Sequence, residues 1–346
     1  MVATARDVAA RAGVSVSTVS RALTHPAMVS ADTRHRVQAA ADDLNYHPNA
    51  HARSLSTGRT YHLGLVVPDL ENPFFAAVAK GVQSYARQLG YSVFIADTDE
   101  NATLETELVA GLAPRVDGVL LCSPRSTPAQ ILGLVETTRI VLINRPVPTM
   151  TSINLDHADG IRQAIRHLWA LGHRLVAYAG GPRASWSDHV RRTAFFDAIA
   201  AEPAMDGLDL GHFQPVHHGG MAAADLAIAS GATAIITYND LMGVGLAQRL
   251  ALRGVRVPDD LSVVGSDGIA QAALFSPALT TIAGPLRQMG CVAVDALINP
   301  VRDVIERLLP VDLIVRSSTA EAPRGPEAFT VRNLAGNPTV LVSGHN

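Results

Sequence analysis

The sequence contains few cysteines and no long apolar run, and both absences restrict the class of protein. Only two of the 346 residues are cysteines, Cys122 and Cys291. Both lie within apolar stretches and form no metal-ligand pattern, so neither a disulfide framework nor a cysteine-bound metal is expected. No run approaches the ~18 apolar residues of a membrane-spanning helix, and the N-terminus lacks the apolar segment of a signal peptide. We therefore expect a cytoplasmic protein without membrane contact.

The motifs of several common enzyme classes are also missing. There is no G-x-x-x-x-G-K-[ST] loop, and Lys80 is the only lysine. GVGLAQ (243–248) begins like a dinucleotide fingerprint but lacks the third glycine, and HHGG (217–220) is not accompanied by a G-x-S-x-G motif. The pair His217–His218 has no third ligand at metal spacing. We expect no catalytic residues, no cofactor and no metal.

Charge is scarce and unevenly distributed. The formal net charge is −3. Residues 1–60 carry seven arginines against four acidic residues, a net charge of +3, whereas the rest of the chain carries −6. A basic segment joined to an acidic body is typical of a localised contact with an anionic polymer such as a nucleic acid. The alternative is a chance fluctuation within a short window.

Residues 4–46 have the caps and the apolar spacing of three short helices. Thr4, Ser15 and Ser30 can each cap a helix N-terminus, and Gly13 permits a tight turn between the first two helices. A helix-turn-helix inserts the start of its second helix into the major groove, where side chains meet base edges and phosphates. The expected DNA contacts in this segment are Thr4, Val16, Ser17, Thr18, Ser20 and Arg21. The guanidinium of Arg21 suits guanine. The alternative is an ordinary three-helix core with Ser and Thr facing solvent.

Beyond residue 61, short apolar runs alternate with amphipathic stretches. Nearly continuous apolar strands separated by helices predict parallel sheets that are covered by helices. The runs are HLGLVV (62–67), YSVFIA (91–96), DGVLLC (117–122), RIVLI (139–143), LVAYA (175–179), TAIIT (233–237) and LSVVG (261–265). They form two series, so the expected fold is an all-α helix-turn-helix head followed by an α/β core of two doubly wound parallel-sheet lobes.

The domain boundaries follow from these patterns. We expect a DNA-binding head at 1–47, a linker at 48–60, a two-lobe body at 61–319 and a C-terminal extension at 320–346. The first lobe is expected to comprise about 61–156 and 285–308, and the second about 157–284 and 309–319. The extension is rich in Pro, Gly and Asn, although TVLVS (339–343) could add an edge strand.

Several stretches, taken in order, resemble the LacI/GalR family of bacterial transcription regulators. ARDVAARAGVSVSTVSRAL resembles the family's helix-turn-helix, VSADTRHRVQAAADDLNYHPNAHARSLSTGRT its third helix and hinge, and LGLVVPDLENPFF the start of its ligand-binding core. VDGVLLCSP, HLWALGHRLVAYAGGP, TAIITYNDLMGVGLAQRLALRGVRVPDDLSVVGSDG and PALTTI follow in the family's order. The resemblance runs from about residue 4 to residue 319. It implies a body like that of periplasmic binding proteins and a homodimer or tetramer.

The resemblance also implies a function for the linker. In this family the hinge segments of a dimer fold as helices on DNA and insert a pair of leucines into the minor groove. The matching residue here is Leu55, and Asn49, Ala52 and Arg53 would line the same groove. An apolar wedge unstacks a base step and bends the duplex. Packing of Leu55 against the head is the alternative.

Polar and aromatic side chains follow the predicted strands of the body. Ligands of parallel α/β sheets bind beyond the carboxyl ends of the strands. The expected effector contacts are Asn72, Phe74, Phe75, Arg145, Trp186, Asp188, Arg191, Asn239, Asp240 and Asp267, and Asn144 and Ser187 lie in the same segments. Aromatic faces together with carboxylates and Arg suit a polyhydroxylated ligand. These positions match the family's effector-contact segments, although Arg192 remains an alternative to Arg191 and helix or turn caps remain an alternative for Asn239, Asp240 and Asp267.

The sequence therefore predicts a ligand-responsive transcription regulator, specifically a repressor. Its affinity for double-stranded operator DNA would change when a small effector, expected to be a sugar, binds between the lobes. A transport-type solute-binding protein shares the two-lobe body but needs an export signal and no DNA-binding head. A sugar-processing enzyme is a further alternative, in which the likeness of the head to a DNA-binding domain would be a coincidence.

Overall fold

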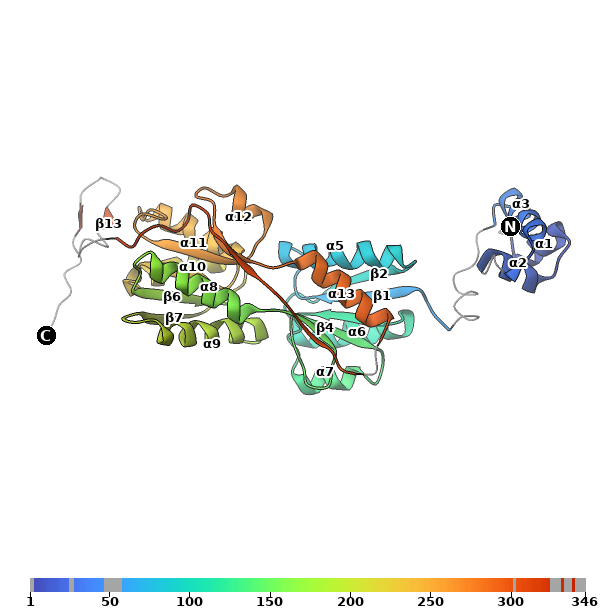
Figure 1. Cartoon of the computed structure of the whole chain (residues 1–346), viewed down its shortest axis with the longest axis horizontal. Helices are drawn as coiled ribbons and strands as arrows, with labels where there is room; N and C mark the ends of the chain where they lie inside the picture. The colour runs from blue at the N-terminus through green and yellow to red at the C-terminus, as the bar shows by residue number, and fades with distance from the viewer. Residues whose placement is uncertain are drawn as a thin grey trace. The chain divides into compact units, whose positions relative to one another are not determined.

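The computed structural model describes residues 3–24, 28–46, 58–300 and 303–323, and two short strands at 331–332 and 338–339. The chain divides into two compact units, Met1–Tyr61 and His62–Asn346. The first unit is helical, and the second holds two α/β lobes (Figure 1). Among the described residues, no helix has the length and apolar character needed to cross a membrane.

The head consists of three helices, α1 (Ala5–Ala12), α2 (Val16–Thr24) and α3 (Ala31–Asp43). The Thr4 side chain accepts a hydrogen bond from the backbone N–H of Asp7 and the Asp7 carboxylate accepts one from Thr4, which forms a capping box at α1. Gly13 ends α1 in the left-handed conformation with φ of 64°. The Ser15 and Ser30 hydroxyls accept bonds from Thr18 N and Thr33 N. The expected caps are thus confirmed.

The N-lobe is a six-stranded sheet with the strand order β11-β5-β4-β3-β1-β2, in which all pairs are parallel. Its strands are β1 (His62–Val67), β2 (Ser92–Asp97), β3 (Val119–Cys122), β4 (Ile140–Ile143), β5 (Ser152–Leu155) and β11 (Glu306–Leu309). Its helices are α5 (Pro73–Gln88), α6 (Ala102–Leu112), the 3-10 turn η2 (Ala113–Arg115), α7 (Pro128–Leu134) and α13 (Leu286–Ile298). Helices α5 and α13 pack together on one face, and α6 and α7 on the other (Figure 1). The central strands β3 and β4 are buried along their whole length.

The C-lobe repeats this arrangement with the strand order β12-β10-β9-β8-β6-β7, and only β12 is antiparallel. Its strands are β6 (Leu175–Gly180), β7 (Asp206–His212), β8 (Ala234–Thr237), β9 (Ser262–Asp267), β10 (Thr280–Ala283) and β12 (Asp312–Ile314). Its helices are α8 (His157–Ala170), α9 (Trp186–Ala201), α10 (His217–Ser230), α11 (Asp240–Leu252) and α12 (Ala270–Leu274). Helices α10 and α11 pack on one face and α8 and α9 on the other (Figure 1).

The chain crosses between the two sheets three times. The crossings connect β5 to α8, β10 to α13 and β11 to β12. Each sheet therefore contains strands from distant parts of the sequence, and the carboxyl ends of both sets of parallel strands meet at the crossings. This places the polar residues that follow the strands between the lobes.

The two doubly wound lobes confirm the predicted fold class, but the apolar runs predicted only part of each sheet. Strands β5, β7, β10, β11 and β12 lacked a distinct apolar run. Strand β7 (DGLDLGH) is a half-exposed edge strand, and the edge strand β11 has three exposed residues of four, so neither needs continuous apolar side chains. In the tail, Pro338–Thr339 pairs with Val331–Arg332 in a separate two-stranded sheet. Of TVLVS, only Thr339 is described, and residues 340–343, on which the edge-strand prediction mainly rests, lie outside the described residues.

Candidate functional site

The start of α2 presents a polar surface on the head. Val16, Ser17, Ser20 and Arg21 are exposed, and Thr18 is half-buried. The hydroxyl of Ser15 lies 2.8 Å from that of Ser17 and 2.9 Å from that of Thr18. The first turn of α2 is therefore held by its own hydroxyls, while Val19, which packs with α1 and α3, fixes the opposite face in the head's core. Thr4 is exposed as well, but its hydroxyl serves the capping box of α1.

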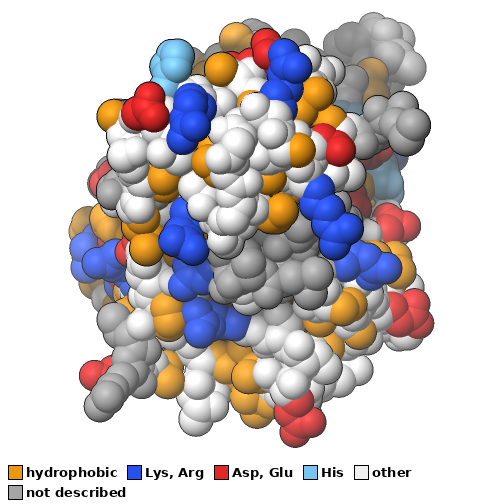
Figure 2. All heavy atoms as spheres, turned by 90° about the vertical axis from the view of Figure 1, so that its right-hand side faces the viewer, with side chains coloured by type: hydrophobic (Ala, Val, Ile, Leu, Met, Phe, Trp, Pro, Cys, Tyr) orange, Lys and Arg blue, Asp and Glu red, His pale blue; other side chains and the backbone are white. Residues whose placement is uncertain are grey.

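The arginines of the head differ in how they are paired. Arg11 is bonded to Asp43 at 2.7 Å, and Arg36 lies 3.4 Å from Asp32. Within the described part of the chain, Arg21 makes no ion pair, and its guanidinium lies 3.5 Å from the Ser17 hydroxyl. Figure 2 shows one face of the molecule, on which several Lys and Arg side chains lie on a mostly uncharged surface. Arg21 thus keeps its charge and its donors available for an anionic partner.

The linker residues expected to enter the minor groove are Asn49, Ala52, Arg53 and Leu55. All four lie outside the described residues. Their expected contacts with DNA remain predictions from the sequence.

A polar hollow of about 290 Å³, including open solvent, lies between the N-lobe and the C-lobe. Five of the residues expected to contact an effector line it: Asn72, Phe74, Phe75, Arg191 and Asp267. The rings of Phe74 and Phe75 are both buried and meet edge to face, with their centres 5.1 Å apart. The hollow therefore combines one aromatic wall with charged groups, and we call it the interlobe cleft.

The C-lobe wall of the interlobe cleft carries a buried ion pair. Arg191, on α9, donates from Nη2 to Asp267 Oδ1 at 3.2 Å and from Nη1 to the backbone oxygen of Tyr238. Its guanidinium also lies over the Tyr238 ring, 5.1 Å from the ring centre. Burial raises the pKa of Asp267 to about 6, although Arg191 acts to lower it. Near neutral pH the pair offers a ligand both donors and a carboxylate acceptor.

The N-lobe wall carries a second guanidinium–carboxylate pair. Both carboxylate oxygens of Glu100 accept from Arg125, one from Nε and the other from Nη2 at 2.9 Å. Arg125 Nη1 donates to Ser123 O at 2.7 Å. The Glu105 carboxylate accepts from the backbone N–H groups of Arg125 and Ser126, which fixes this turn after β3. Glu100 and Arg125 face the same hollow as Arg191.

Hydrogen bonds join the two walls through His157 at the start of α8. His157 Nε2 lies 2.6 Å from Asn144 Oδ1, and Asn144 in turn donates to the Ser123 hydroxyl at 3.1 Å. On the other side, Arg191 Nε donates to His157 Nδ1 at 3.4 Å. Burial and then the charge of Arg191 hold the pKa of His157 well below its ordinary value, so the ring is neutral. A group bound at Arg191 is thus connected to the N-lobe by a short polar chain.

Five of the residues expected to contact an effector do not line the interlobe cleft, because their side chains bond to or pack against other groups of the protein. Asp188 accepts from Tyr178 Oη and Gly181 N, and Asn239 caps α11. Both carboxylate oxygens of Asp240 are used, by Thr281 and by the backbone N–H of Ile269. Arg145 is buried and donates to Pro124 O, and Trp186 packs 6.2 Å from the His157 ring.

Sequence reasoning missed several residues that do line the interlobe cleft: Glu100, Ser123, Arg125, Pro215 and Tyr238. Glu100 and Arg125 each lie three residues after the end of a strand, β2 or β3, both of which the apolar runs had predicted. The rule that ligands bind beyond strand ends applies to these two strands as well and could have identified both residues.

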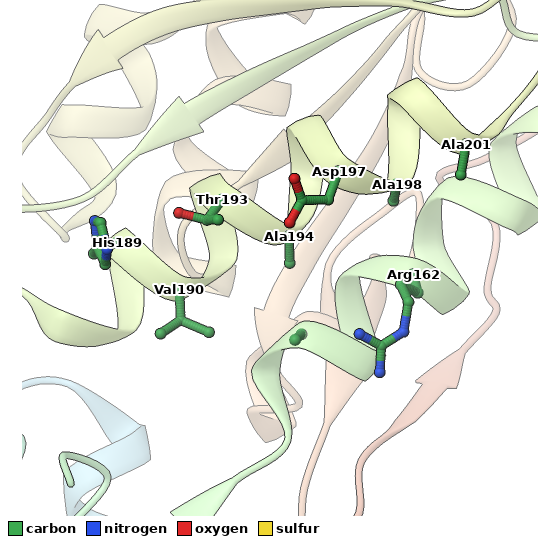
Figure 3. A pocket seen from close by; sticks show the side chains of 9 residues that line it. Arg162, His189, Val190, Thr193, Ala194, Asp197, Ala198 and Ala201 are labelled. Atoms are coloured by element: carbon green, nitrogen blue, oxygen red, sulfur yellow. The ribbon is translucent and has the colours of Figure 1, made fainter.

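A larger hollow of about 660 Å³, including open solvent, lies on the outside of the C-lobe between α8 and α9 (Figure 3). Its lining is mostly small or apolar, with Arg162, His189 and Asp197 as its charged or titratable groups. Its larger volume alone would favour this hollow as the ligand site. Convergent polar groups in an enclosed site are the better indicator of a ligand, and they favour the interlobe cleft.

The buried carboxyl of Asp240 leads to a prediction about stability. Burial, together with the charge of Asp267, raises the pKa of Asp240 to about 8, above its unfolded value. The folded state then holds a proton that the unfolded state releases, so raising the pH from 6 to 8.5 should lower the free energy of unfolding, by up to about 1.4 kcal/mol per pH unit. We expect Asp240→Asn to reduce this fall, measured as Tm against pH by calorimetry.

The matched control is Asp225→Asn. Asp225 is half-exposed and is paired with Arg249 and Arg253, so its pKa is lowered and its contribution to stability changes only at acid pH. Equal slopes of Tm between pH 6 and 8.5 for the Asp240→Asn and wild-type proteins would contradict the prediction.

Comparisons with known proteins match both units of the chain. The family described as bacterial regulatory proteins, lacI family, matches residues 4–49, and the periplasmic binding protein-like domain matches residues 165–319. The HTH-type transcriptional regulator DegA of Bacillus subtilis is 31% identical over 92% of this chain and 99% of its own length. The HTH-type transcriptional repressor PurR of Photobacterium profundum is 34% identical over 87% and 92%, and the ribose operon repressor of Halalkalibacterium halodurans is 31% identical over 91% and 97%.

Solved structures show the same similarity. The Lac repressor dimer bound to operator and the anti-inducer ONPF has a TM-score of 0.83 and 29% identity, over 92% of this chain and all of that one. The complex of the transcriptional regulator CelR with cellobiose has a TM-score of 0.68 and 29% identity, over 91% and 99%. A regulator from Enterococcus faecium with bound ribose has a TM-score of 0.68 and 27% identity, over 75% and 99%.

Proposed function

Because this chain belongs to the lacI family of bacterial regulatory proteins, we propose that it is a ligand-responsive transcriptional repressor. Its head binds a specific double-stranded operator, and a small effector in the interlobe cleft changes that affinity. The observation that carries the proposal is the interlobe cleft itself, since Arg191, Asp267, Glu100 and Arg125 line it together. A regulator that acts on chromosomal DNA works in the cytoplasm, and the Lac repressor, crystallised as a dimer on its operator, supports a homodimer.

A sugar is the effector class that this chemistry supports best. A hydroxyl group both donates and accepts, and each guanidinium–carboxylate pair offers both functions. The rings of Phe74 and Phe75 supply an apolar face for the carbons of a sugar ring. Cellobiose in CelR and ribose in the Enterococcus faecium regulator support the same class.

The proposed regulation is a coupling between two equilibria. The effector favours one relative angle of the lobes, and the DNA-bound dimer favours one as well. If the two angles differ, the effector weakens DNA binding, and if they agree, it strengthens DNA binding. A coupling of about 1–3 kcal/mol corresponds to a change in affinity of roughly 5- to 150-fold. The Asn144–His157–Arg191 chain spans both lobes and is the contact through which a ligand at Arg191 can bias their angle.

The test begins with a DNA site selected from a random library by the full-length protein. Fluorescence anisotropy then gives the affinity for this site with and without sugars from a thermal-shift panel. We expect Leu55→Ala to lower operator affinity about tenfold, because the minor-groove wedge is lost, and to leave effector affinity unchanged. Absence of any selected site would contradict the DNA-binding function. Equal operator affinity for both proteins would contradict only the contribution of Leu55.

A further inference from the structure

The Glu100–Arg125 pair lies on the wall of the interlobe cleft opposite the Arg191–Asp267 pair. We propose that Glu100 and Arg125 are specificity-determining residues, which restrict the effector to an uncharged polyhydroxylated molecule and exclude its phosphate esters. This inference rests on the proposed function, since it assigns the chemistry of the ligand in the same cleft. It goes beyond the proposed function by assigning to this N-lobe pair the discrimination between uncharged and phosphorylated ligands.

The geometry keeps donors and acceptors of this pair available. A guanidinium has five N–H groups. Among the described residues, Glu100 and the backbone oxygen of Ser123 occupy three of those of Arg125, which leaves two for a ligand. The Arg125 side chain is only 3% exposed, whereas that of Glu100 is 26% exposed. Glu100 is therefore the part of the pair that an entering ligand meets with its hydroxyls.

The backbone also holds these groups in place. Glu100, Ser123, Asn144 and Asp267 each have a positive φ, at 58°, 44°, 59° and 112°. Glu100, Ser123 and Asn144 follow the ends of parallel strands, Asp267 is the last residue of one, and all four line the interlobe cleft. Residues other than glycine rarely adopt a positive φ, and those that do cluster where a structure positions functional groups. The residues of this set thus come from both walls of the cleft, three from the N-lobe and Asp267 from the C-lobe.

The charges in the interlobe cleft balance. Arg125 is paired with Glu100, and Arg191 with Asp267, so each guanidinium already has a carboxylate partner. Behind this wall, the carboxylate of Glu105 and the buried guanidinium of Arg145 add one charge of each sign. A phosphate or a sugar acid would bring negative charge next to Glu100 and Asp267, and among the described residues both guanidiniums that line the cleft already have a carboxylate partner. An uncharged sugar meets no such repulsion.

The experiment uses isothermal titration calorimetry on the full-length protein with two matched pairs of probes. These are D-ribose with D-ribose 5-phosphate, and D-glucose with D-glucose 6-phosphate. We expect the wild-type protein to bind a free sugar at least tenfold more tightly than its phosphate ester. Glu100→Gln leaves Arg125 with an unneutralised charge and should reduce this preference at least tenfold. Arg125→Gln should increase the preference, because Glu100 is then unpaired.

Glu107→Gln is the matched control, because it makes the same charge change on an exposed position of α6 away from the interlobe cleft. We expect it to keep the wild-type preference. A wild-type protein that binds the phosphate ester more tightly would overturn the inference, as would equal preferences in the Glu100→Gln and Glu107→Gln proteins. If neither these probes nor any sugar of the thermal-shift panel binds to any variant, the proposed sugar effector fails together with this inference, whereas a free sugar that binds without the expected preference refutes the inference alone.

Discussion

Arg21→Ala is expected to lower the affinity for the operator about 10- to 100-fold and to relax the preference at one base pair. A bidentate contact between an arginine and guanine contributes roughly 1–3 kcal/mol of discrimination. Arg21 is exposed on α2, one turn beyond Ser17, and makes no ion pair within the described residues. Anisotropy against the selected site and its single-base variants measures both effects.

The control for Arg21 is Arg36→Ala, which removes the same charge from the head. Arg36 lies on α3 beside Asp32, so its charge is already partly neutralised. We expect its loss to change operator affinity no more than about threefold, without a change in base preference. If the two variants lose affinity equally and keep the same base preference, Arg21 contributes only charge and does not read a base.

Arg191→Gln is expected to lower effector affinity by at least about 100-fold, which is roughly 2.7 kcal/mol. Arg191 is 4% exposed, and its N–H groups donate hydrogen bonds to Asp267, Tyr238 and His157. The substitution removes the cation from the C-lobe wall and also breaks the polar chain to Asn144. Operator binding should persist but no longer respond to the effector. Calorimetry with the sugar identified by the panel measures affinity, and anisotropy measures the response.

The matched control is Arg192→Gln, which tests the neighbouring arginine that sequence reasoning could not separate from Arg191. Arg192 contacts Asp209, Asp188 and the backbone oxygen of Gly211, and it does not line the interlobe cleft. We expect its loss to change effector affinity less than threefold. If Arg192→Gln loses more effector affinity than Arg191→Gln, and both variants keep the wild-type melting temperature, the effector contact belongs to Arg192 and not to Arg191.

Local patterns in the sequence were sufficient to predict the head and the class of fold. Caps such as Thr4 and Ser30 act on backbone groups two or three residues away, so they can be recognised without tertiary information. The buried central strands β1, β3 and β4 consist almost entirely of apolar residues, which makes them visible as runs. The polar edge strands β7 and β11 lack this pattern and became visible only through their pairing.

Of the ten residues that the sequence predicted as effector contacts, five line the interlobe cleft. The order of residues along the chain is enough to show that polar residues follow the strands, and the rule for parallel sheets places them at the same edge. Which of them face the interlobe cleft depends on how the lobes pack. Asp240 and Asp267 both follow or end a C-lobe strand, yet the carboxyl group of Asp240 is bonded to Thr281 and to the backbone of Ile269, whereas Asp267 pairs with Arg191 in the cleft. The physical reason is that a buried polar group must find a partner, and the partners come from segments far away in the sequence.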